Sequence, residues 1–134
     1  MARKYKLDHI IICDDVRRED NQKEIIIGMY ANGEIVFATL PAVTPILTFR
    51  LQLRSPEPLR ATAQFQVRSP SKLLILSAEA QIESPALPQI IVLLFQRTPS
   101  TFQEDGDFDI LFGIDEKPRK IGQFKVVDRS KSPA

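Results

Sequence analysis

Hydrophobic and polar residues alternate along much of this chain with a period of two, the pattern of strands that bury one face. The alternation is most regular over residues 47–54 and 59–68, where leucine, alanine, phenylalanine and valine alternate with threonine, glutamine and arginine. It returns over residues 72–82 and 107–114. A helix would place apolar residues three and four apart, so these stretches predict strands.

Other stretches are apolar without interruption. Isoleucine triplets at residues 10–12 and 25–27 flank a charged segment and predict an opening hairpin of two core strands, the first over residues 4–16, with its turn at Glu19–Lys23. Asn32-Gly33 predicts a tight turn that adds a third strand to this meander. Residues 89–96 predict a strand buried on both faces.

The pattern predicts about nine strands joined by short polar connections. The simplest architecture is an all-β fold, a single-domain antiparallel β-sandwich of immunoglobulin-like character over residues 1–127. A partly closed β-barrel is the alternative. Residues 128–134 lack apolar content and predict a flexible C-terminal tail.

Composition narrows the classes of function. The 134 residues carry a formal net charge of +1, which argues against nucleic acid and membrane surfaces as partners. Cys13 is the single cysteine, so neither an intrachain disulfide nor a cysteine metal cluster can form. No apolar run approaches the roughly 18 residues of a spanning helix. We therefore expect a cytoplasmic protein with no membrane segment and no cofactor.

Hydroxyl–proline pairs recur through the second half, and they are Ser55-Pro56, Ser69-Pro70, Ser84-Pro85 and Thr98-Pro99. Proline presets the backbone for a turn and serine can cap it, so the repeat predicts turns between strands. Proline-directed phosphorylation is the alternative interpretation.

The first charged cluster contains Asp14, Asp15, Arg17, Arg18, Glu19 and Asp20. In the structural interpretation, Asp14 or Asp15 pairs with Arg17 or Arg18 in an ion-pair corner of the hairpin. In the functional interpretation, Asp15, Glu19 and Asp20 supply oxygen ligands to calcium or magnesium.

A second acidic group contains Glu104, Asp105, Asp107 and Asp109. A solvated sheet edge is the default interpretation, with Asp105 and Asp107 as weak metal candidates. No catalytic residue emerges. His9 and Cys13 would lie about 13 Å apart on one strand, and no phosphate loop, dinucleotide fingerprint or nucleophile elbow occurs.

The polar faces of residues 48–54 and 60–68 carry arginine, threonine and glutamine, and together predict a flat basic-amide surface. Nucleic-acid platforms expose aromatic rings for stacking. Phe49 and Phe65 belong to the apolar faces instead. The surface therefore favours a protein partner over nucleic acid.

The segment Ile11-Ile-Cys-Asp-Asp-Val-Arg-Arg-Glu-Asp-Asn, followed by Ile27-Gly-Met-Tyr30, resembles the opening of an uncharacterised bacterial family classed as a domain of unknown function. The resemblance is strongest over residues 8–41. It implies a small cytosolic β domain and no assigned activity. Members commonly carry Asn-Gly after the glutamate, whereas this chain has Asp20-Asn21-Gln22, which leaves the turn type open.

From these observations we expect a non-enzymatic binding or scaffolding module with a protein partner, and possible homo-oligomers through sheet edges. The alternative is a calcium- or magnesium-binding module, or a metal-dependent enzyme, that uses the acidic residues near 14–20 and 104–109.

Overall fold

The computed structural model describes residues 5–20, 23–84 and 89–131. Twelve strands and no α-helix lie within them, so the all-β prediction is confirmed. The strands are β1 (Lys6–Cys13), β2 (Asp15–Arg18), β3 (Glu24–Ile27), β4 (Glu34–Phe37), β5 (Ala42–Thr44), β6 (Leu47–Ser55), β7 (Leu59–Arg68), β8 (Leu74–Ser84), β9 (Gln89–Arg97), β10 (Ser100–Phe102), β11 (Gly106–Ile114) and β12 (Arg119–Asp128). A 3-10 helix, η1, covers Arg129–Lys131.

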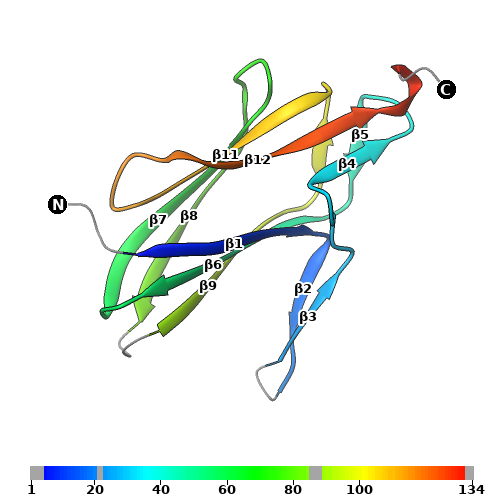
Figure 1. Ribbon diagram of the computed structural model, residues 1–134. Coiled ribbons are helices and arrows are strands. Elements are labelled where there is room, and N and C mark those ends of the chain that lie inside the picture. Colours follow the sequence, from blue (N-terminus) through cyan, green and yellow to red (C-terminus); the bar gives the residue numbers. More distant parts are fainter. Residues whose placement is uncertain (1–4, 21–22, 85–88, 132–134) are drawn as a thin grey trace.

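Two larger sheets form the body of the molecule (Figure 1). One has three antiparallel strands in the order β1-β6-β9. The other has five strands in the order β4-β12-β11-β7-β8 and curls into a half-barrel. The described residues also form two two-stranded sheets, β2-β3 and β10-β5.

Phenylalanines join the two larger sheets. Phe65 on β7 is fully buried, and its ring stacks on Phe95 of β9 with centroids 4.5 Å apart. It also contacts Phe49 of β6 at 5.1 Å. Because β7 belongs to one sheet and β6 and β9 to the other, these rings hold the apolar faces of the sheets together.

The same arrangement corrects the predicted basic-amide surface. β6 and β7 lie in different sheets with their apolar faces toward each other, so their polar faces point to opposite sides of the molecule. Thr48 and Arg50 on the polar face of β6 are buried as well. The flat surface predicted over residues 48–68 therefore does not form.

The purely antiparallel prediction is wrong, because Lys125–Asp128 of β12 pair in parallel with Glu34–Phe37 of β4. The Asn32-Gly33 turn does reverse the chain: Gly33 has a φ of 65° and donates its N–H to the Tyr30 carbonyl at 3.2 Å. After the turn, however, β4 bonds to β12 and not to β3. The predicted three-strand meander is therefore wrong.

Three differences explain why the structure has more strands than predicted. The first predicted strand breaks at Asp14, which separates β1 from β2. β5 and β10 are only three residues long, too short to show a period.

β9 lies at the edge of its sheet and exposes Ile90 and Leu94, so the prediction that it buries both faces is also wrong.

The hydroxyl–proline pairs lie where turn chemistry would place them. The Ser55 hydroxyl donates to the Glu57 carbonyl at 2.6 Å, and the Ser69 hydroxyl accepts the Leu73 N–H at 3.1 Å. Both serines are buried. Pro85, in the third pair, lies outside the described residues.

The chain beyond Val127 continues in contact with the sheet. Asp128 belongs to β12, and its carboxylate accepts the Ser130 N–H at 3.0 Å and the Leu40 N–H at 3.4 Å. Residues 132–134 of the predicted tail lie outside the described residues.

Candidate functional site

The β2-β3 hairpin extends away from both larger sheets (Figure 1). Asp15 of β2 is opposite Ile27 of β3, and the antiparallel pairing continues to Arg18 opposite Glu24. Among the described residues, no further strand pairs with β2 or β3. Ile25, Ile26 and Ile27 are 44%, 37% and 37% exposed. The prediction that this triplet forms a core strand is wrong: within the described residues β3 pairs with the charged strand β2 alone, and none of the three isoleucines belongs to the hydrophobic core.

Arg50 ties this hairpin to the three-stranded sheet. It is 7% exposed, and its guanidinium donates to both carboxylate oxygens of Glu24, at 2.7 and 3.3 Å. It also lies 3.1 Å from His9 Nε2 and donates to Gln52 Oε1 at 3.2 Å. The hydrogen bond from Arg50 lowers the pKa of Glu24, against the opposite effect of burial. The sequence pattern suggested an exposed arginine here and missed this ion pair.

Asp14 fixes the point where β1 gives way to β2. Its carboxylate accepts the Tyr30 hydroxyl at 3.0 Å, and its carbonyl accepts the Thr48 hydroxyl at 2.9 Å. Burial, and then the bond to Asp14, raise the pKa of Tyr30. Asp14 thus has a tyrosine as its hydrogen-bond partner, where the sequence suggested Arg17 or Arg18.

Asp15 faces the three-stranded sheet. Its carboxylate accepts the Gln96 amide at 3.1 Å and lies 3.9 Å from Arg17 Nε. Arg17 is largely exposed, so this ion pair contributes little. Arg18 is exposed, and its charge contributes to the lowered pKa of Glu24.

The acidic metal candidates do not gather. Glu19 and Asp20 are exposed on the hairpin turn, of which Asn21 and Gln22 lie outside the described residues. No group of three or more histidine, cysteine, aspartate or glutamate side chains within those residues could hold a metal ion.

In the second acidic group, lysines lie beside the three aspartates, while Glu104 accepts the Ser71 N–H at 2.9 Å and the Ser71 hydroxyl at 2.7 Å. Lys131 lies 3.7 Å from Asp105, and Lys125 is opposite Asp107 on the neighbouring strand. Lys120 and Lys72 lie 3.1 and 3.4 Å from Asp109. The hydrogen bond from Lys120 lowers the pKa of Asp109.

Gly28 allows the close contact between the hairpin and Asp14. We expect Gly28→Ala to lower the free energy of unfolding by about 1–3 kcal/mol, because φ is 67° and a β-carbon would collide with the Asp14 carboxylate. Gly33→Ala is the matched control, with φ 65° and open space around it. Urea denaturation should show a larger loss for Gly28→Ala, and equal losses would contradict the collision.

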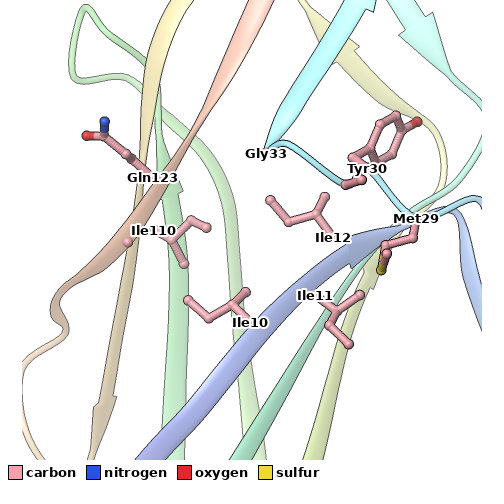
Figure 2. Close-up of a pocket in the computed structure, with 10 residues that line it drawn as sticks. Ile10, Ile11, Ile12, Met29, Tyr30, Gly33, Ile110 and Gln123 are labelled. Atoms are coloured by element: carbon pink, nitrogen blue, oxygen red, sulfur yellow. The ribbon is translucent and has the colours of Figure 1, made fainter.

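A second feature is a slot of about 200 Å³ between the two larger sheets (Figure 2). Ile10 and Ile12 of β1 point across it toward Ile110 of β11, and Gly33 lies at its end. Gly122 of β12 forms part of the base, where a β-carbon would lie only 3.3 Å from Ile10 Cδ1. Isoleucine side chains thus line the slot beside polar surface of about the same extent.

These features define an all-β domain with exposed isoleucines on one strand of a hairpin and a slot between its two larger sheets. The chain belongs to the Family of unknown function (DUF6941), whose model matches residues 8–127. No curated protein matches the sequence. Within the described residues, no helix has the length and apolar content needed to cross a membrane.

Proposed function

We propose that this protein is a non-enzymatic protein-binding module whose contact surface is the β2-β3 hairpin. The three consecutive exposed isoleucines of β3 carry the proposal. Soluble proteins normally protect a free strand edge with proline, charge or a bulge. Within Ile25–Ile27 β3 has none of these, and Met29 beside it is 55% exposed. Successive side chains of a strand point to opposite faces, so these isoleucines expose apolar surface on both faces of β3. Exposed apolar surface that borders a free strand edge is typical of interaction sites.

The partner that fits best is a second copy of this chain. If two β3 strands pair antiparallel about Ile26, each Ile26 faces its counterpart and each Ile25 faces Ile27 of the other copy. Glu24 then faces Gly28, so no like charges meet. The result is a four-stranded sheet with twofold symmetry, whereas a two-stranded hairpin alone is marginally stable.

Ile26→Lys tests this surface. It removes two isoleucines from the interface and places two lysines opposite each other, so self-association should weaken by at least about 100-fold. Light scattering across a concentration series should show a dimer for the natural chain and a monomer for the variant. Leu73→Lys is the control, since Leu73 is 61% exposed but lies outside every described strand. A natural chain that stays monomeric at high concentration would contradict the proposal.

An immunoglobulin-like arrangement is part of the proposal. That fold places strands A, B and E side by side in one sheet, and G, F, C and C′ in the other. The order β1-β6-β9 and the order β12-β11-β7-β8 follow this scheme. NMR contacts between amides of neighbouring strands test it, and pairing of β6 with β7 would contradict it. Bacterial origin and cytoplasmic location stay predictions.

The metal-binding alternative is tested separately. Titration with calcium, magnesium or manganese should leave the thermal midpoint unchanged, since a ligand that binds only the native state would raise it. A rise of several degrees would favour the metal-binding alternative. Asp15→Asn and Asp107→Asn would then show which acidic group binds the ion.

A further inference from the structure

The slot exists because the Tyr30–Gly33 turn moves the chain from one sheet to the other. The Gly33 carbonyl accepts the Lys125 N–H at 2.8 Å, at the start of the β4-β12 pairing. Three residues earlier, the Tyr30 N–H bonds the Ile12 carbonyl of β1 at 2.9 Å. β4 therefore covers only Lys125–Asp128, and no described strand pairs with the first half of β12 on that side.

Backbone groups point into the slot from both walls. The Ile12 carbonyl bonds Tyr30 on the side away from β6, and backbone directions alternate along a strand. The N–H and C=O of Ile10 therefore also point away from β6. By the same rule, Lys125 N–H points toward β4, so the N–H and C=O of Gln123 point to the same side, beyond the end of β4. Among the described residues, no strand pairs on this side with β1, or with β12 before Lys125, and no turn or loop backbone bond reaches these groups.

The side chains around these groups favour an apolar occupant. Ile10, Ile12 and Ile110 line the slot, while the Gln123 side chain points away from it and accepts a hydrogen bond from Lys120 at 3.1 Å (Figure 2). Polar recognition in the slot thus falls to the backbone.

We infer that the slot binds an extended peptide segment of a partner protein by strand addition, in line with β4. An extended backbone supplies donors and acceptors at the spacing that Gln123 offers, and alternate side chains of valine or isoleucine would enter the apolar base. This site is separate from the β3 edge, and it does not depend on self-association.

Amide hydrogen exchange in the unmodified protein is the first test. The amides of Ile10 and Gln123 should exchange at least about tenfold faster than those of Ile11 and Phe124, which point into paired ladders. Equal protection of Gln123 and Phe124 in the free protein would overturn the inference, because the slot would already be closed.

The second test uses a soluble, end-blocked peptide in which valine alternates with threonine as the probe. It should slow exchange at Ile10 and Gln123, and a matched peptide with central prolines should not. Gln123→Pro should weaken binding at least about tenfold, because it removes the N–H that faces the slot and leaves the β11 ladder intact. Should this variant not fold, the exchange pattern with the unmodified chain decides the matter. Protection confined to Ile25–Ile27, or protection at neither site, would overturn the inference.

Discussion

Replacing Arg50 by alanine is expected to lower the free energy of unfolding by about 2–4 kcal/mol, because it leaves the partly buried Glu24 carboxylate without its partner. Arg50 is also the main polar tie between β6 and the hairpin. The amides of β2 and β3 should therefore exchange faster in the variant, while those of the β6-β9 ladder change less.

Arg54→Ala is the matched control for this prediction. Arg54 lies on the same face of β6 and pairs with Asp8 at 2.8 Å, but its side chain is 59% exposed. Its loss should cost less than about 1 kcal/mol. Urea denaturation of both variants measures the difference, and equal losses would show that burial of Arg50 contributes nothing.

The Arg50 effect should depend on pH. The pKa of Glu24 is lower in the folded protein than its ordinary value of 4.5. Its contribution is therefore present above the ordinary pKa and is lost as the pH falls through the folded value. The difference in the free energy of unfolding between the natural chain and Arg50→Ala should therefore narrow as the pH falls from about 4.5 through the lower pKa of Glu24 in the folded protein. A difference that stays constant down to acid unfolding would contradict the role of Glu24.

Phe65→Ala should have the largest effect on stability, a loss of about 3–5 kcal/mol. Phe65 is fully buried and contacts rings of both β6 and β9, so its removal opens a cavity between the two larger sheets. Val43→Ala is the control, since Val43 is largely exposed, and it should cost less than about 0.5 kcal/mol. Denaturant unfolding measures the loss for both variants, provided that the dependence of the unfolding free energy on denaturant concentration is unchanged. A loss below about 1 kcal/mol for Phe65→Ala would contradict the central position of this ring.

Strand positions and core faces could be predicted where one face is apolar and the other polar. Residues 47–54 and 59–68 form β6 and β7, and Phe49, Leu51, Phe65 and Val67 are buried as the alternation predicts. A continuous apolar run is less informative, because it does not show whether anything covers both faces. The apolar runs at Ile25–Ile27 and Ile90 predict burial for this reason, but these residues are exposed.

The candidate site was less predictable than the fold. The sequence drew attention to the charged residues of the hairpin, but Asp14 bonds Tyr30 and Glu24 bonds Arg50. The residues of the first pair are 16 positions apart in the sequence, and those of the second pair are 26 positions apart. The polar pattern of β6 contains Arg50, and nothing local to it shows that a hairpin folds over that face.

The sequence by itself determined the all-β class, most strand positions and the reversal at Asn32-Gly33, because strand periodicity and turn geometry depend on neighbouring residues. Only the tertiary structure decided which strands pair. Gly33 turns the chain, but the bond from Lys125 places β4 beside β12, and the bond from Tyr30 to Ile12 opens the slot. Strand partners depend on backbone groups that meet across long sequence separations, so both proposed binding surfaces could be seen only in the folded chain.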